Sequence, residues 1–473
     1  MHTKETGGRA GLRKRLIGDK NFYKMVLTVT IPIMIQNGIT NFVSLLDNIM
    51  VGQVGTEQMS GVAVANQLLF VFNICIFGAI SGAGIFGAQF FGNGNYEGVR
   101  NAFRFKLMIC AALVLLAIGI FLAGGEGLIS LYLNEEGSAQ DAARTLGYGK
   151  AYLMCMLAGL VPYALAQVYA STLREAGETV LPMKAGVAAV LVNLALNYVL
   201  IYGKFGAPAL GVVGAAIATV ISRYVECLIV ALSSHGKRGK ASYLDGVYRT
   251  LRIPSRLAGQ IVLRGTPLMI NEALWAAGMA VLMQCYSLRG LSVIAGLNIS
   301  STLSNLFNVV YLALGNAVAI IVGQLLGAGK MEEARDTDTK LLAFSVGSCL
   351  IIGALMVPVA ALFPRMYNTT PEVRSLAERF ILIAAALMPV QGFTNACYFT
   401  MRSGGKTFVT FLFDSVFLWV VSIPLAFVLS RFTALPIVPL YFICQAVDIV
   451  KCVIGFVMVR RGVWIHNFVT AEK

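Results

Sequence analysis

The sequence predicts an all-α polytopic membrane protein with twelve transmembrane helices. Of its 473 residues, 57% are hydrophobic and only 13% are charged, whereas about a quarter of the residues in a typical soluble domain are charged. Twelve apolar stretches reach the roughly 20 residues that a helix needs to cross a bilayer. A repeat relates the first six stretches to the last six, so we expect two six-helix bundles related by pseudo-two-fold symmetry along the membrane normal.

Short polar or glycine-rich loops separate the predicted spans. The second and eighth spans are too long for one straight crossing, so we expect them to tilt, bend or extend past the bilayer surface. The predicted spans are 25–50, 59–90, 101–124, 150–172, 179–203, 211–234, 257–285, 292–327, 340–363, 376–401, 407–431 and 436–459.

The basic residues are distributed unevenly between alternate loops. Most of the 37 Lys and Arg residues lie in the N-terminal tail, the even-numbered loops and the C-terminal tail. This is the positive-inside pattern, which predicts that both termini are cytoplasmic in a multi-pass protein of the plasma (inner) membrane. The net charge of +14 is therefore a topology signal, and we expect the lipid bilayer, not a nucleic acid, as a partner.

A long basic connection divides the chain almost in half. We expect a basic cytoplasmic tail at 1–24, a first lobe with spans 1–6 at 25–235 and a cytoplasmic linker at 236–256. A second lobe with spans 7–12 should follow at 257–460, and a cytoplasmic C-terminal tail at 461–473.

An internal repeat supports this division. At one constant offset, GAQFFGNGNYEGVR aligns with VGQLLGAGKMEEAR. Each half has an even number of spans, so both halves insert in the same orientation, which is a common transporter plan with a substrate cavity between the bundles. The matched pairs include Pro32/Pro267, Gln89/Gln324, Gly92/Gly327, Gly94/Gly329 and Arg100/Arg335.

The first span contains an acidic residue on a polar strip. In QNGITNFVSLLDN, helical spacing places Gln36, Thr40 and Asp47 on one strip. A carboxylate in hydrocarbon is costly unless it faces protein or water, so Asp47 is a functional-site hypothesis, and Gln36 and Thr40 are candidates for the cavity wall.

The fifth span contains two amides, Asn193 and Asn197, on one face. Together with a carboxylate they would form an oxygen-rich cage, suited to a proton relay or a hard monovalent cation. The alternative is a pair of interhelical hydrogen bonds with no transport role.

The second half contains two more acidic residues within spans. Glu272 has Asn271 beside it and Trp275 one turn on, and Asp414 lies seven residues into its span. A second ion site is therefore one reading, with a position of Asp414 near the surface as the alternative. Asn298 begins a polar stripe on the eighth span, and we expect Asn271, Trp275 and Asn298 to line the cavity.

Two acid–base pairs lie three residues apart within spans, Arg223 with Glu226 and Asp448 with Lys451. We expect both to be local ion pairs. All three histidines lie outside the spans, so no metal site is expected beyond a possible Na⁺ site, and no enzyme activity and no cofactor.

Several short motifs along the chain, some of them present in both halves, resemble those of a known family. The VGQ…G-x-G loops, the L-R-x-x-G element after spans 4 and 10 and the N-x-x-x-N of span 5 resemble the multidrug and toxic compound extrusion (MATE) family. The resemblance covers about residues 20–460. It implies two six-helix lobes that export organic cations and other drugs by proton or sodium antiport, and a monomer.

The resemblance also assigns residues in the first lobe. Asp47 matches the family's span-1 aspartate, Asn193 its span-5 asparagine and Thr219 a span-6 threonine of the same network. Asn197 stands where some members have a second aspartate.

In the second lobe the match is looser. Glu272 is near the family's span-7 glutamate, with a shorter spacing from the proline of that span. Gln391 occupies the region where some members have a span-10 aspartate, and Asp414 could take over that role.

The sequence thus predicts an antiporter driven by H⁺ or Na⁺ that exports organic, mostly cationic compounds by alternating access. Protonation of Asp47 would alter its bonds to Asn193, Asn197 and Thr219. The alternatives are a flippase for a lipid-linked precursor, a membrane-embedded enzyme and a scaffold. A flippase should have a strongly cationic cavity, but Arg223 and Lys451, the cations central to their spans, each have an acid nearby.

Overall fold

The computed structural model describes residues 16–131, 139–236 and 241–469, without the side chains of residues 44, 45, 48, 49, 56 and 139. These residues form helices and connecting turns and no strand. Twelve helical segments are long and apolar enough to cross a membrane, so the predicted fold class is confirmed. Residues 1–15 of the expected N-terminal tail, 237–240 of the linker and 470–473 of the C-terminal tail lie outside the described residues.

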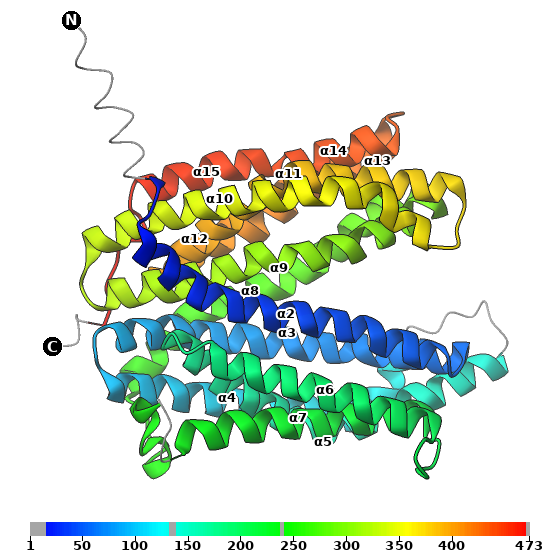
Figure 1. Cartoon of the computed structure of the whole chain (residues 1–473), viewed down its shortest axis with the longest axis horizontal. Coiled ribbons are helices and arrows are strands. Elements are labelled where there is room, and N and C mark those ends of the chain that lie inside the picture. The colour runs from blue at the N-terminus through cyan, green and yellow to red at the C-terminus, as the bar shows by residue number, and fades with distance from the viewer. Residues whose placement is uncertain (1–15, 132–138, 237–240, 470–473) are drawn as a thin grey trace, which may run out of the picture. The chain divides into compact units, whose positions relative to one another are not determined.

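The helices follow the predicted spans in order (Figure 1). In the first half they are α2 (Lys20–Gly52), α3 (Thr56–Gly92), α4 (Tyr96–Ser130), α5 (Ala139–Glu175), α6 (Val180–Tyr202) and α7 (Gly211–His235). In the second half the first four are α8 (Ser255–Ser287), α9 (Leu291–Gly327), α10 (Met331–Leu362) with the short η3 (Phe363–Met366), and α11 (Pro371–Ser403).

The last two spans are interrupted. The eleventh consists of α12 (Thr407–Phe411), the π-helical segments η4 (Leu412–Val416) and η5 (Leu418–Ser422), and α13 (Ile423–Phe432). The twelfth is divided into α14 (Ile437–Ala446) and α15 (Asp448–Arg460). The π segments are a feature that the apolar pattern does not reveal, and such segments often mark functional positions.

The chain forms two compact units. Unit 1 comprises Met1–Met34, Ala88–Gly94 and Thr266–Lys473, and unit 2 comprises Ile35–Gly87 and Asn95–Gly265. The division points within α2 and α8 fall close to the repeat-related prolines Pro32 and Pro267. The expected lobes at 25–235 and 257–460 stay a prediction.

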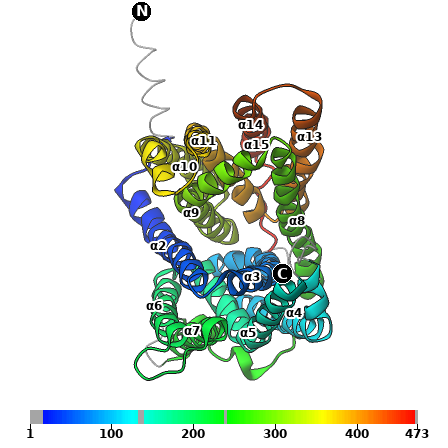
Figure 2. The same ribbon diagram turned by 90° about the vertical axis from the view of Figure 1, so that its right-hand side faces the viewer.

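In unit 2, α7 packs between α5 and α6, and α4 packs on α5 (Figure 2). The connection after α7 lies against the start of α4 through two short turns, η1 (Ser242–Leu244) and η2 (Val247–Arg249). Arg100 donates to the carbonyl of Asp245 at 3.0 Å, and Arg104 donates to the carbonyl of Val247 at 2.8 Å. The linker is therefore fixed to unit 2 by backbone carbonyls.

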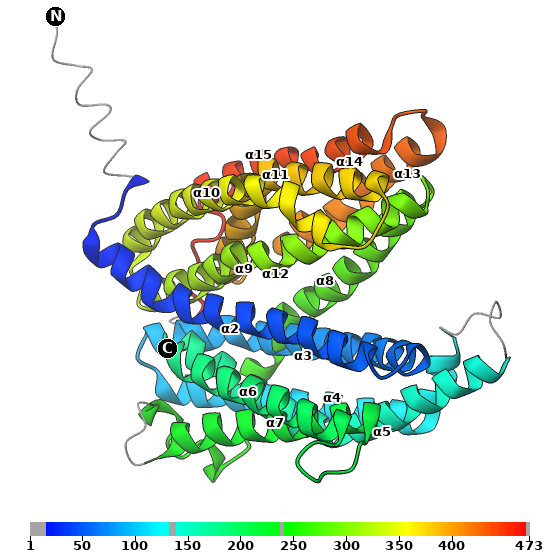
Figure 3. The same ribbon diagram turned by 45° about the vertical axis from the view of Figure 1, so that its right-hand side comes forward.

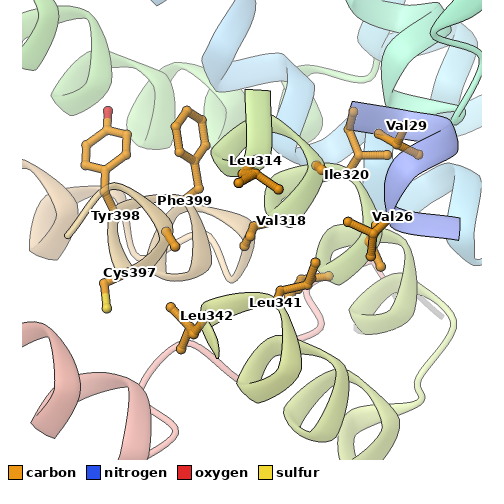
Figure 4. Close-up of a cluster of buried hydrophobic side chains, with 14 of the residues drawn as sticks. Val26, Val29, Leu314, Val318, Ile320, Leu341, Leu342, Cys397, Tyr398 and Phe399 are labelled. Carbon is orange, nitrogen blue, oxygen red and sulfur yellow. The ribbon is translucent and has the colours of Figure 1, made fainter. Parts of the chain in front are cut away.

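In unit 1, α11 packs against α9, α10 and α15 (Figure 3). An apolar core lies where α9, α10 and α11 meet the first part of α2 (Figure 4). Val26 and Val29 come from α2, and side chains such as Val318, Leu341 and Phe399 come from the other three helices.

The repeat is visible in a reciprocal contact within unit 1. A Cβ added at Gly92 would lie 2.0 Å from the carbonyl oxygen of Gln324, and one added at Gly327 would lie 2.0 Å from that of Gln89. The ends of α3 and α9 therefore approach as closely as backbones can. Each helix has 37 residues, which is longer than one straight crossing, as expected.

Candidate functional site

The four predicted first-lobe residues meet inside unit 2. Asp47 lies on α2, Asn193 and Asn197 on α6 and Thr219 on α7. The Nδ2 of Asn197 donates to the Asp47 carboxylate at 2.6 Å, a short charge-assisted hydrogen bond. Asn193 and Asn197 are only 5% and 1% exposed. The polar face of α6 is thus turned to protein and is satisfied there.

The amide of Asn193 fits this group in two orientations. With its nitrogen toward Thr219, it donates to the Thr219 hydroxyl at 3.2 Å and its oxygen accepts from Asn197. With oxygen and nitrogen exchanged, it donates to both oxygens of Asp47 at 3.1 Å and accepts from Thr219. We assign the second orientation, because it adds donors to the carboxylate.

One oxygen of this group has no donor. In the portion of the chain that the structure describes, nothing hydrogen-bonds to the buried Oδ1 of Asn197. A buried carbonyl oxygen without a partner is unusual. Together with the Asp47 carboxylate it provides oxygens that a proton or a small hard cation can use.

Two further residues belong to the surroundings of Asp47. Tyr152 on α5 is 5% exposed and lies within electrostatic range of Asp47, as does Arg223 on α7. Arg223 contacts Glu226 at 3.1 Å, so this predicted ion pair is confirmed. Sequence reasoning missed Tyr152, and no spacing in α5 distinguishes it from a packing residue.

The other predicted residues of α2 lie apart from this group. Gln36 is 9% exposed and accepts a hydrogen bond from Arg174 at 3.0 Å. Thr40 is exposed, and its hydroxyl bonds to the carbonyl of Gln36. Gln36 is therefore occupied inside unit 2, whereas Thr40 has the exposure that a cavity wall requires.

In unit 1, Asn271 joins α8 to η4. Its Oδ1 accepts from the Ser415 hydroxyl at 2.7 Å, and its Nδ2 donates to Asp414 at 3.1 Å. It is 1% exposed, so its side chain serves packing between helices. Glu272 beside it accepts a long hydrogen bond, 3.4 Å, from Tyr398 of α11.

The expected local ion pair of span 12 is wrong. The Lys451 ammonium lies 2.6 Å from Asp414 of η4, not on Asp448 of its own helix. Asp448 instead accepts from Gln391 of α11 at 2.8 Å. Three residues of separation make a local pair available, but the rotation of α15 turns Lys451 toward η4.

The remaining cavity candidates have exposed side chains. Trp275 on α8 is 42% exposed, and Asn298 on α9 is also exposed. Among the residues that the structure describes, no three or more His, Cys, Asp or Glu side chains form a metal-binding group.

The chain is similar in sequence to known efflux proteins. The family model MatE matches residues 32–199 and 267–428. A probable multidrug resistance protein NorM of Thermotoga maritima is 23% identical over 445 residues, with 93% of each chain covered. A multidrug resistance protein MdtK of Pectobacterium atrosepticum is 26% identical over 411 residues, with 85% of this chain and 86% of the relative covered.

Solved structures share the fold. The outward-facing conformation of a multidrug resistance MATE family transporter of the MOP superfamily has a TM-score of 0.81 at 20% identity, covering 94% of this chain and 96% of that one. A MOP superfamily transporter from Pyrococcus furiosus, described as having a binding pocket of reverse polarity that suggests a different function, has a TM-score of 0.82 at 20% identity, covering 95% and 98%. Because these identities are low, they show the fold alone.

Proposed function

The chain belongs to the MatE family, and on that premise we propose that this multi-pass membrane protein is a cation-coupled antiporter that exports organic, mostly cationic compounds. The NorM and MdtK relatives carry multidrug resistance names, which supports the drug-export class. We further propose that both termini lie in the cytoplasm of a cell-membrane protein that works as a monomer.

The observation that carries the proposal is the hydrogen bond between Asn197 and Asp47. A carboxylate within a membrane span is usually functional, and this one is surrounded by amide and hydroxyl groups on α6 and α7. Charged Asp47 accepts N–H bonds, so it holds α2 against α6. A bound proton or cation removes that charge from the network and weakens these bonds, which biases the packing of the helices.

The energy available for this coupling depends on the charge of the exported compound. Moving one charge across about 150 mV releases about 3.5 kcal/mol. Each 1.4 kcal/mol corresponds to about a tenfold concentration ratio, so one ion sustains a ratio of a few hundred for a neutral compound. When the exported compound is a monovalent cation, the two charge movements cancel, and the concentration gradient of the ion drives the exchange.

The ion is either H⁺ or Na⁺, and the first-lobe oxygens suit both. The test is efflux of a fluorescent organic cation from proteoliposomes that contain the purified wild-type protein. Proton and sodium gradients are imposed separately, and liposomes without protein are the control. Efflux with one gradient supports antiport, whereas efflux unaffected by either gradient contradicts it.

The second candidate, a flippase for an anionic lipid-linked precursor, is less well supported. Lys106 is a further buried cation, and its ammonium contacts both oxygens of Glu175 at 2.6 and 2.7 Å. Arg223 and Lys451 also have acidic partners. Cations that are neutralised by acids inside a unit do not form the anion site that such a substrate needs.

A further inference from the structure

The Lys451 ammonium forms an ion pair with the carboxylate of Asp414 inside unit 1. The ammonium lies 2.6 Å from Oδ1 of Asp414, and Nδ2 of Asn271 donates a hydrogen bond to Oδ2 of Asp414 at 3.1 Å. Both side chains of the ion pair are largely buried, 14% exposed for Lys451 and 20% for Asp414. The ammonium also lies 5.2 Å from the centre of the Phe413 ring, a cation–π distance.

Other acids lie close to this pair. Glu272 of α8 is within electrostatic range of Asp414 and of Arg402. Asp448 of α15 is within range of both Lys451 and Asp414. Two further carboxylates from two other spans therefore lie in the region of the Asp414–Lys451 pair, and oxygen ligands are those that a hard cation prefers.

A cation attached to the chain differs from a dissolved one in that its local concentration is fixed. The tether keeps the Lys451 ammonium next to Asp414 at an effective concentration far above that of free Na⁺. A sodium ion could enter only by displacing the ammonium from the carboxylate that it contacts, which is unfavourable.

We propose that Lys451 is a built-in cation that takes the place of Na⁺ at the Asp414 carboxylate, so that the acidic residues around Asp414 do not bind Na⁺. This proposal rests on the proposed antiport, and it assigns the coupling step to the first-lobe carboxylate. Lys451 is thus a residue that determines ion specificity.

The helices around the pair explain why it stays in place. Asp414 lies in the π-helical η4, and Ser415 after it bonds Asn271 through both its backbone N–H and its hydroxyl. Lys451 adds the link from η4 to α15. The ammonium therefore joins spans 11 and 12, and Asn271 joins span 7 to span 11.

The test is to remove the tethered cation and look for a gain of sodium binding. Purified wild-type, Lys451→Met and Lys451→Met/Asp414→Asn proteins are unfolded thermally in about 100 mM NaCl or choline chloride, which keeps the ionic strength equal. The matched control is Lys330→Met, which removes an exposed lysine paired with Glu333 in the same unit.

We expect Na⁺ to raise the melting temperature of Lys451→Met by about 2 °C more than those of the wild type, the double variant and the control. Any Na⁺ bound at the first-lobe carboxylate acts on all four proteins alike. A folded Lys451→Met protein that responds to Na⁺ no more than the wild type does overturns the proposal.

A second measurement covers the case in which Lys451→Met does not fold. Proton-driven efflux by the wild type is compared in NaCl and in choline chloride, and equal rates are expected. A requirement for Na⁺ overturns the proposal while leaving antiport intact. Conversely, an absence of gradient-driven efflux refutes the antiport, but the melting experiment still reports on Lys451.

Discussion

Asn197 lies 2.6 Å from Asp47 although 150 residues separate them in the chain. The contact joins the first span to the fifth within unit 2. The first-lobe mechanism depends on this one interhelical bond.

Replacing Asn197 with Leu should therefore impair transport. The substitution removes an N–H donor from a charged acceptor, which costs about 1.5 to 3 kcal/mol, and we expect gradient-driven efflux to fall about tenfold or more. Asn316→Leu, which removes an amide on α9 that bonds the carbonyl of Leu312 in the same helix, is the matched control. Efflux by Asn197→Leu at the control rate would show that the bond plays no part in coupling.

The buried pair Lys106–Glu175 should be important for stability. Lys106 is 0% exposed, and its ammonium also bonds the hydroxyls of Ser171 and Thr172 at 3.2 and 3.1 Å. Lys106→Met leaves Glu175 buried without its cation, so we expect unit 2 to lose about 3 to 5 kcal/mol.

Thermal unfolding of the purified protein measures this loss. Lys106→Met/Glu175→Gln should recover much of it, because neither partner is left charged. Lys150→Met, at an ion pair that is exposed on both sides, should leave the melting temperature unchanged. Equal effects of the Lys106 and Lys150 substitutions would argue against a buried pair.

Because α3 and α9 approach so closely, a side chain in place of a glycine at their contact should destabilise the protein. In Gly327→Ala the new methyl would lie 2.0 Å from the Gln89 carbonyl oxygen, so the helices must separate, at a cost of about 1 to 3 kcal/mol. Gly347→Ala on α10, where nothing lies within 4 Å, should instead stabilise slightly, because alanine favours helix. Melting temperatures that move in the same direction would refute the close contact.

Much of the fold was predictable from the sequence, for physical reasons. Apolar length specifies the spans, and the glycine and glutamine matches of the repeat reappear in the reciprocal contact of α3 with α9. The grouping of Asp47 with Asn193 and Asn197 was predicted, because buried polar side chains on helices must find each other, whereas Thr219 was assigned to it by the family resemblance. Their role in coupling stays a prediction.

Other features could not be predicted from local patterns. Asp414 lies 37 residues from its partner Lys451, and the choice of Asp414 over Asp448 depends on the rotation of α15. The π segments of span 11 and the burial of Asn271 depend on the same packing. None of these has a signal within a single helix.

The segment after α15 was expected to be a cytoplasmic tail, and its described part is anchored in unit 1. Trp464 is 1% exposed. The buried side chain of Gln89 donates to the carbonyls of Ser403 and His466 at 3.1 and 3.2 Å, and accepts from the N–H of Phe468 at 3.4 Å.

Gln89→Leu should therefore release this segment, because three backbone groups lose their partner. We expect trypsin to cleave after Arg461 faster in this variant than in the wild type. Asn316→Leu, which removes an exposed amide of α9 that bonds only its own helix, is the control. Identical cleavage rates would show that Gln89 does not anchor the segment.

The most direct test of the account is ion-driven efflux by Asp47→Asn in proteoliposomes. The substitution keeps the shape of the side chain and removes its charge, and Glu126→Gln, at an exposed acid of the same unit, is the control. We predict that Asp47→Asn remains folded but loses at least about nine-tenths of gradient-driven efflux, since the charge that the proton or cation must neutralise is gone. Efflux by Asp47→Asn at the rate of the wild type would contradict the account.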